Sequence, residues 1–173
     1  MNKGNSGRLV RLIVGSLLYQ CVWFAAVYFA SSSVFHGLGV KLAVGCILIQ
    51  FLIWPHLRIR ITALAVVACL AGLFLDSLLT VIGIFDLARH VMPYPLTPLW
   101  LLALWAGFGV YIAVGLEGMY GRLRLAALGG FIGGPLAYRG GVPFDAVTLG
   151  DPAWRSLLII GVAWAGVFAM LVW

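Results

Sequence analysis

ITALAVVACLAGLFLDSLLTVIGI, residues 61–84, is an apolar stretch that carries a single charged side chain, Asp76. A helix of about 20 apolar residues is long enough to cross a lipid bilayer. At helical spacing one face of this stretch collects its small and polar residues, which are Cys69, Gly72, Asp76, Thr80 and Gly83. The stretch therefore predicts a membrane-spanning helix with one narrow face that meets protein or water rather than lipid.

The composition of the whole chain agrees with this prediction. Of the 173 residues, 64% are hydrophobic and 9% are charged, whereas soluble domains have about 25% charged residues. The apolar runs have the length of spanning helices and not of the short alternating strands of an outer-membrane barrel. We predict an all-α integral membrane protein, a six-transmembrane-helix bundle that forms a single domain over residues 1–173.

Prolines, glycines and charged residues separate the six predicted spans. Pro55 ends the second span, because proline cannot donate the next helical hydrogen bond. Three prolines within residues 93–98 exclude regular helix from the longest connection. The predicted spans are about 9–30, 39–54, 61–84, 99–115, 125–138 and 153–173.

The formal net charge of +6 arises from residues in short loops between apolar runs. This placement indicates membrane topology and gives no reason to expect a nucleic-acid partner. Most of the Lys and Arg residues fall on the side of the N-terminus, namely Lys3, Arg8, Arg11, Arg58, Arg60, Arg122 and Arg124. The positive-inside rule then predicts that the N- and C-termini of this multi-pass protein are cytoplasmic.

Asp76 is the first candidate functional residue. An aspartate near the bilayer centre costs about 2.5–3.5 kcal/mol on insertion scales, so it needs hydrogen-bond donors, a water-filled cavity or a proton. Candidate partners are Gln20, Tyr19 and Trp23 in the first span, Gln50 in the second, Thr80 one turn further along the same span, and Arg139. Two interpretations stay open: a relay or ligand anchor, and a hydrogen bond between helices that fixes packing, with the first span as the expected partner.

The fifth span is rich in glycine. Gly129 with Gly133, and Gly130 with Gly134, form two overlapping GxxxG pairs, and Pro135 follows. Such pairs let two helices approach closely, as does Gly72 in the third span. Packing is the leading interpretation of this distorted segment, and a broken helix that lines a substrate cavity is the alternative.

Aromatic residues and histidines complete the candidate set. Trp100 lies near the end of a span, where tryptophan is typical of the membrane interface, whereas Trp105 lies deeper and suits a core or a pocket. His90 with Asp86 in the third loop is the one plausible acid–base pair. The histidines have no spacing typical of a metal site, and we expect neither a metal nor a cofactor.

Several segments resemble one family over nearly the whole length of the chain. They are residues 17–25 (LLYQCVWFA), residues 72–79 (GLFLDSLL), Trp100 with Trp105, and residues 133–138 (GGPLAY). The chain resembles a family of small bacterial inner-membrane proteins, the domain of unknown function number 2878. The resemblance implies an inner-membrane location and a link to membrane lipid modification, but no activity. It touches the ligand or polar-core candidates Asp76, Gln20, Trp23, Trp100 and Tyr138, and Arg139 follows the last of these.

Three functions compete. The leading hypothesis is a non-enzymatic accessory or scaffold factor that holds a membrane-associated enzyme or another membrane protein. The alternative is a lipid or small-solute transporter or flippase-like subunit, a homodimer in this version, with a polar site around Asp76. The third is an intramembrane enzyme that uses Asp76 or the Asp86–His90 pair. Membrane lipid is an expected partner in all three.

Overall fold

The computed structural model describes residues 3–89 and 91–173, with the exception of the side chains of residues 3–5 and 36. These residues form six α-helices: α1 (Lys3–Tyr28), α2 (His36–Ile53), α3 (Arg58–Val81), α4 (Leu99–Val114), α5 (Leu123–Gly141) and α6 (Ala153–Leu171). Among the described residues, three segments are long and apolar enough to cross a membrane: Ser6–Tyr28, Pro55–Val81 and Ala153–Leu171. The prediction of a mostly helical protein is confirmed, and these three segments have the length and composition that membrane spans require.

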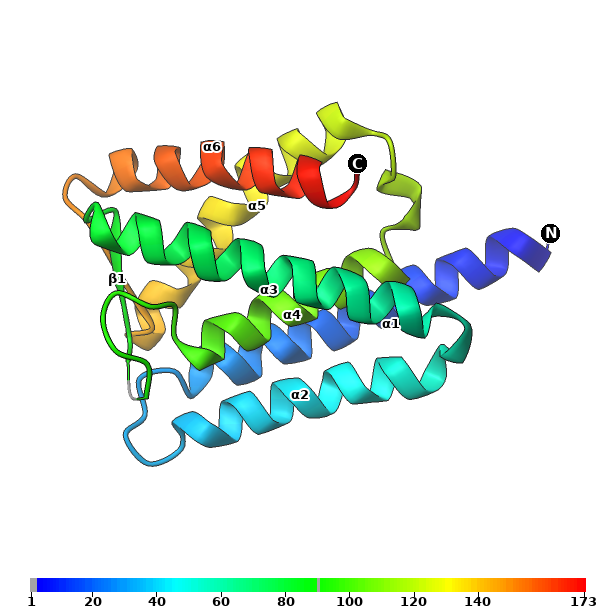
Figure 1. Ribbon diagram of the computed structural model, residues 1–173, viewed down its shortest axis with the longest axis horizontal. Helices are drawn as coiled ribbons and strands as arrows, with labels where there is room; N and C mark the ends of the chain where they lie inside the picture. The colour runs from blue at the N-terminus through cyan, green and yellow to red at the C-terminus, as the bar shows by residue number, and fades with distance from the viewer. Residues whose placement is uncertain (1–2, 90) are drawn as a thin grey trace.

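Consecutive helices run antiparallel, and the two termini lie at the same end of the bundle (Figure 1). Helix α4 is central, because most of its residues are buried and it packs against α1, α2 and α3. Helices α5 and α6 pair chiefly with each other. In Figure 1, α5 runs obliquely behind α3, from the side of α6 toward the side of α1.

The helix boundaries follow from the local sequence. Pro98 and Pro152 stand in extended conformation directly before α4 and α6, where their missing N–H and fixed φ cost nothing. Gly83 has a φ of +72°, which glycine adopts without strain, and it directs the chain away from the end of α3.

One expectation about the fifth span is wrong. The segment was expected to be strongly distorted and to end near residue 138, but α5 is one helix that contains Pro135 and continues to Gly141. Gly161 of α6 lies against the Pro135 ring and the Phe131 carbonyl, where a Cβ would crowd both. The close approach of α6 therefore supports the turn of α5 in which Pro135 removes a backbone hydrogen bond.

A short antiparallel ladder joins the two longest connections. Strand β1 (Phe85–Leu87) pairs with β2 (Val147–Leu149) in the register Phe85↔Leu149, Asp86↔Thr148 and Leu87↔Val147. Hydrogen bonds from Ala88 N to Ala146 O (3.0 Å) and from Gly150 N to Ile84 O (2.9 Å) extend the pairing on both sides. This ladder, which ties the α3–α4 connection to the α5–α6 connection, was not predicted from the sequence.

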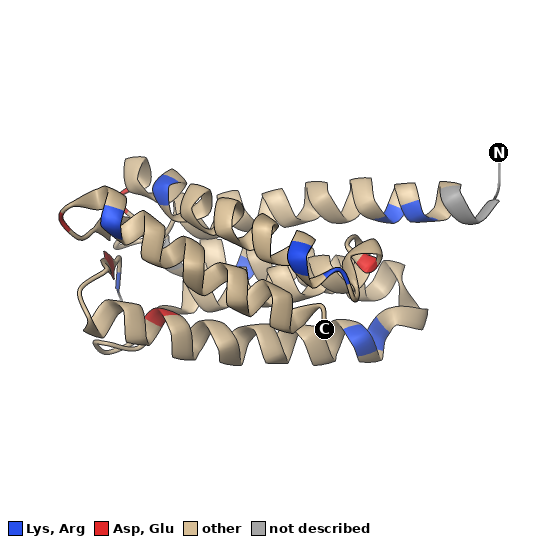
Figure 2. Ribbon diagram, turned by 90° about the horizontal axis from the view of Figure 1, so that it is seen from above, with Lys and Arg blue, Asp and Glu red and all other residues tan. Residues whose placement is uncertain are grey.

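The surface between the two ends of the bundle is largely apolar. Phe74 and Leu136, for example, are 83% and 66% exposed on the helix surfaces. The charged residues lie mainly toward the two ends, and the ribbon between them is mostly uncharged (Figure 2). This distribution is typical of a protein whose middle section contacts hydrocarbon.

Candidate functional site

Asp76 is fully buried at the centre of the bundle, on the last part of α3. Trp105 Nε1 of α4 donates a hydrogen bond of 2.6 Å to its Oδ2 atom. The Tyr138 hydroxyl of α5 donates a hydrogen bond of 2.5 Å to its Oδ1 atom. Each carboxylate oxygen thus has a donor from a different helix, and the carboxylate links α3, α4 and α5.

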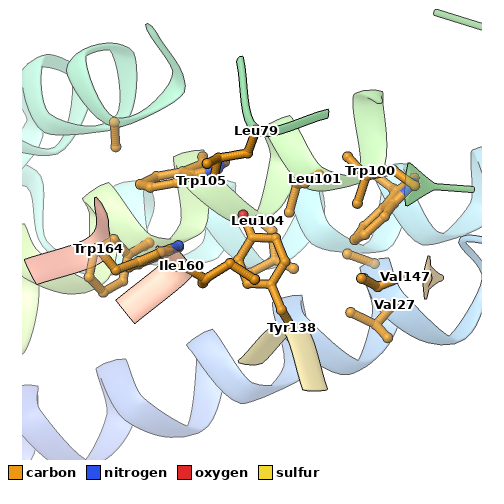
Figure 3. Close-up of a cluster of buried hydrophobic side chains, with 14 of the residues drawn as sticks. Val27, Leu79, Trp100, Leu101, Leu104, Trp105, Tyr138, Val147, Ile160 and Trp164 are labelled. Carbon is orange, nitrogen blue, oxygen red and sulfur yellow. The ribbon is translucent and has the colours of Figure 1, made fainter. Parts of the chain in front are cut away.

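Neighbouring residues hold these donors in place. The Trp105 ring lies directly over Gly72, one turn before Asp76, and a Cβ at Gly72 would overlap the ring. The other face of the cluster is formed by Trp164 of α6, whose ring stacks on Trp105 with centroids 4.4 Å apart. Figure 3 shows Trp105, Tyr138 and Trp164 converging from three helices. We call Asp76, Trp105, Tyr138 and Trp164 the Asp76 cluster.

Trp164 brings a third polar group to this cluster. Its Nε1 atom is buried without a hydrogen-bond partner within the described part of the chain, although it approaches the side of Tyr138. The cluster therefore contains more donors than the carboxylate accepts in this arrangement.

The structure corrects the expected partner of Asp76. The first span was expected to close over the small-and-polar face of the third span, but α4 covers Gly72 and α4 and α5 supply the donors. Arg139, another expected donor, is exposed on α5, whereas its neighbour Tyr138 is buried. Consecutive residues of a helix point about 100° apart, so only one of these two side chains can face Asp76.

A groove of about 340 Å³ opens between α1 and α5, beside the Asp76 cluster. Phe108, Trp164 and Phe168, from α4 and α6, contribute to its lining together with residues of the two flanking helices. The α1 side is formed by Tyr19, Gln20, Trp23 and Phe24, and the α5 side by Gly129, Gly130, Gly133, Gly134, Leu136, Ala137 and Gly140. We call it the α1–α5 groove.

The two GxxxG pairs of α5 serve different surfaces. Gly130 and Gly134 are buried against α6, where a Cβ would overlap the backbone or the ring of Trp164. Gly129 and Gly133 are exposed, and a Cβ at Gly133 would meet nothing within 4 Å. One pair is used for packing inside the chain, and the other leaves part of the α5 backbone uncovered along the groove.

Gln20 is the polar group of the α1–α5 groove. Its side chain is exposed, lines the groove and has no hydrogen-bond partner among the residues that the structure describes. Trp23 lies half-buried next to it and meets the Phe144 ring edge-on, at a centroid distance of 6.4 Å. The structure thus separates Gln20 and Trp23 from Asp76, with which they had been grouped.

The remaining candidates lie elsewhere. Trp100 is buried and donates a hydrogen bond of 2.9 Å from its Nε1 atom to the Ala88 carbonyl, at the end of the β ladder. Gln50 is fully buried on α2, and neither its Nε2 nor its Oε1 atom has a partner within the described residues. His90 lies outside the described residues, so the Asp86–His90 pair cannot be placed.

The described residues contain no group of three or more His, Cys, Asp or Glu side chains that could hold a metal ion. Sequence reasoning missed Phe108 and Phe168, which line the groove. They stand in apolar helices without any local feature that distinguishes them from core residues, so only the packing of α4 and α6 reveals them.

Comparison with known proteins identifies a family but no activity. The model of the family "protein of unknown function (DUF2878)" matches residues 12–170. No curated protein and no solved structure matches the chain. The chain therefore belongs to the DUF2878 family, as its sequence pattern predicted.

Proposed function

We propose that this DUF2878 family member is a non-enzymatic accessory protein of the bacterial inner membrane. In this proposal, the α1–α5 groove binds a transmembrane helix of another membrane protein. The observation that carries the proposal is the exposed amide of Gln20, which is unpaired within the described part of the chain and lies beside the uncovered glycine face of α5.

The proposed topology has six spans with both termini in the cytoplasm. The antiparallel order of the helices and the position of both termini at one end of the bundle support it (Figure 1). Arg8 and Arg11 at that end share Glu117, at 3.0 and 2.7 Å, which leaves a net positive charge in this group. An excess of positive charge is typical of the cytoplasmic side.

An apolar groove in a membrane accepts either an acyl chain or a transmembrane helix, and the amide of Gln20 favours one of them. An acyl chain fills apolar space but offers no partner to an amide. A transmembrane helix brings side-chain or backbone groups, and hydrogen bonds between such helices stabilise their association by roughly 0.6–2 kcal/mol. The requirement for a hydrogen-bond partner therefore favours a helix.

The exposed glycines of α5 also favour a transmembrane helix as the occupant of the groove. Helices associate in membranes mainly through close packing, because lipid tails are as apolar as leucine side chains. At Gly133 the α5 backbone is open to an approaching helix, whereas the equivalent surface at Gly134 is already occupied by Trp164. The groove therefore offers the small-residue surface that close helix contacts need.

The closed Asp76 cluster gives no support to the two other hypotheses where they place the site at Asp76. A transporter or flippase-like subunit with a site around Asp76 needs a cavity that reaches the carboxylate, and an intramembrane enzyme needs access for its substrate. Asp76 is fully buried, and both of its oxygens accept hydrogen bonds from the protein. Its geometry supports a role in fixing α3, α4 and α5.

Photo-crosslinking in native membranes tests the proposal. A benzoyl-phenylalanine residue replaces Gly133 in the groove or, as a matched control, Gly166 of α6, which is also exposed with nothing within 4 Å of a Cβ. We expect position 133, but not 166, to give an adduct of defined mass with one other membrane protein. Mass spectrometry should locate the adduct within a transmembrane helix of that protein.

The same experiment repeated with Gln20→Leu should lose the adduct, since the amide contact is removed while the shape of the groove is kept. An adduct between two copies of this chain would replace the proposed partner with a homodimer. Adducts with lipid alone, or equal adducts at positions 133 and 166, would overturn the proposal.

A further inference from the structure

A second pocket lies at the end of the bundle that carries the β ladder, away from the α1–α5 groove. It has a volume of about 300 Å³ and lies between the end of α3, the β1–β2 ladder and the loop before α4. Its lining residues are Thr80, Gly83, Phe85, Asp86, Tyr94, Thr148, Leu149 and Gly150. This volume is at the lower end of the range for small-molecule sites, about 300–1,000 Å³.

Polar side chains converge on this pocket from three separate segments. Asp86 and Thr148 are directly opposite each other in the ladder, and both are exposed. Cross-strand partners project from the same face of a sheet, so their side chains form one wall together. Tyr94, from the loop before α4, adds an aromatic ring that is 64% exposed.

Thr80 provides the observation that points to a ligand. Its side chain is 4% exposed and lines the pocket. Its Oγ1 atom has no hydrogen-bond partner within residues 3–89 and 91–173. Buried hydroxyl groups in native proteins are nearly always hydrogen-bonded, so an unpaired one on a residue in the pocket wall is available to a ligand once its side chain turns toward the opening.

Arg89 neutralises the local charge without occupying the pocket. Its guanidinium lies 3.4 Å from the Asp86 carboxylate, donates a 2.5 Å hydrogen bond to the Leu96 carbonyl and stacks on the Tyr94 ring. The Asp86–Arg89 pair leaves no large excess of either sign. A phosphate would meet the Asp86 carboxylate, and a metal ion would find only one carboxylate, so neither is favoured.

We propose that this pocket binds a hydroxyl-rich ring of monosaccharide size, either as a free sugar or as the headgroup of a glycolipid. The Asp86 carboxylate accepts hydrogen bonds from ligand hydroxyls. The hydroxyls of Thr80, Tyr94 and Thr148 both donate and accept, as ligand hydroxyls do. The exposed face of Tyr94 packs against the C–H face of the ring.

A binding experiment on the whole protein tests this assignment. The protein is purified without glycoside detergents and placed in nanodiscs that contain only phosphatidylethanolamine and phosphatidylglycerol. One arm titrates methyl glycosides of glucose, galactose and N-acetylglucosamine and measures saturation-transfer NMR. A second arm adds glucosyl-diacylglycerol to the nanodiscs and measures retained lipid by native mass spectrometry.

We expect binding in at least one arm, and the arm that shows it identifies the source of the sugar. Asp86→Asn and Tyr94→Leu should each weaken it by about tenfold or more, because each removes a direct contact. Asp151→Asn, at an exposed aspartate of the same end outside the pocket lining, should leave it unchanged. Thermal unfolding of every variant shows that loss of binding does not come from loss of folding.

The proposal would be overturned by the absence of binding in both arms, or by an equal loss in the Asp151→Asn control. Binding of inorganic phosphate or Ca²⁺ that depends on Asp86 and Tyr94 would overturn the assignment of the ligand. None of these results bears on the α1–α5 groove, whose test uses other residues and another readout.

Discussion

The Asp76 cluster and the α1–α5 groove are neighbours that share Trp164, yet they treat polar groups in opposite ways. In the cluster both oxygens of a carboxylate are bonded to donors from other helices. In the groove the amide of Gln20 is exposed and unpaired among the described residues. The difference supports a role for the cluster in completing the fold of the chain itself, whereas the groove leaves an amide available to the partner proposed above.

Replacing the Asp76 carboxylate should have the largest effect on stability and tests whether the cluster completes the fold. Asp76→Ala leaves the buried Trp105 N–H and Tyr138 O–H groups without partners, at about 1–3 kcal/mol each. We expect the free energy of unfolding to fall by about 2–6 kcal/mol, measured by denaturant unfolding in mixed micelles. The crosslink of the folded fraction at position 133 should persist.

Asp76→Asn is the control for Asp76→Ala, because it removes the carboxylate but keeps the size and the hydrogen-bonding capacity of the side chain. Its carbonyl oxygen can accept from Trp105 Nε1 while its amino group donates to the Tyr138 oxygen, since a hydroxyl both donates and accepts. We expect a loss of about 1 kcal/mol and an intact crosslink at position 133. Abolition of partner binding by Asp76→Asn in a fully folded protein would instead assign Asp76 to the function.

Substitutions at the adjacent glycines Gly133 and Gly134 of α5 should differ in their effect on stability, and the effect at Gly134 should be the second largest. Gly134→Ala places a methyl group against the Trp164 ring, and such overpacking costs about 1–3 kcal/mol. Gly133→Ala meets open space and should change stability by less than about 1 kcal/mol, toward stabilisation, because alanine is the better helix former. Equal effects of the two substitutions would contradict the division of α5 into a packed and an uncovered face.

Tyr138→Phe should lower the stability by a smaller amount and tests the charge of Asp76. It removes the hydroxyl that donates to Asp76 Oδ1 and keeps the ring, which packs 5.0 Å from the Phe85 ring. A hydrogen bond to a charged group contributes roughly 1.5–3 kcal/mol and one between neutral groups 0.5–1.5 kcal/mol. The measured loss therefore reports whether the carboxylate is charged in the folded protein.

Gln20→Leu should have the smallest effect on the isolated protein. Because the amide makes no hydrogen bond within the described chain, its removal should change the unfolding free energy by less than about 0.5 kcal/mol, as for other surface positions. Denaturant unfolding in the same micelles measures this change. A loss of several kcal/mol would show that Gln20 stabilises the fold and would remove it from the groove proposal.

The sequence indicated which face of α3 is special but not which helices meet it. Periodicity places Gly72, Asp76 and Thr80 on one face, and all three are buried. It does not determine which helix crosses that face, so the first span was expected where α4 and α5 lie. The same limit explains the choice between Tyr138 and Arg139, because a residue pattern alone does not fix the rotation of α5 about its axis.

The overlapping GxxxG pairs show a related limit. Gly129 and Gly130 differ by one residue and about 100° of rotation, so they serve different surfaces although the motif is the same. The β ladder was not predictable for another reason. Its strands have three residues each, lie in separate connections and have no strand pattern of their own, so their pairing depends on how α3 to α6 bring the two loops together.

The β1–β2 ladder also has a mechanical consequence. It fastens the α3–α4 pair to the α5–α6 pair at one end of the molecule, while the groove lies between α5 and α1, which packs against α4. Two helix pairs that are joined at one end separate most at the opposite end. Any widening of the groove that admits a partner should therefore pivot about the ladder and be largest near the two termini.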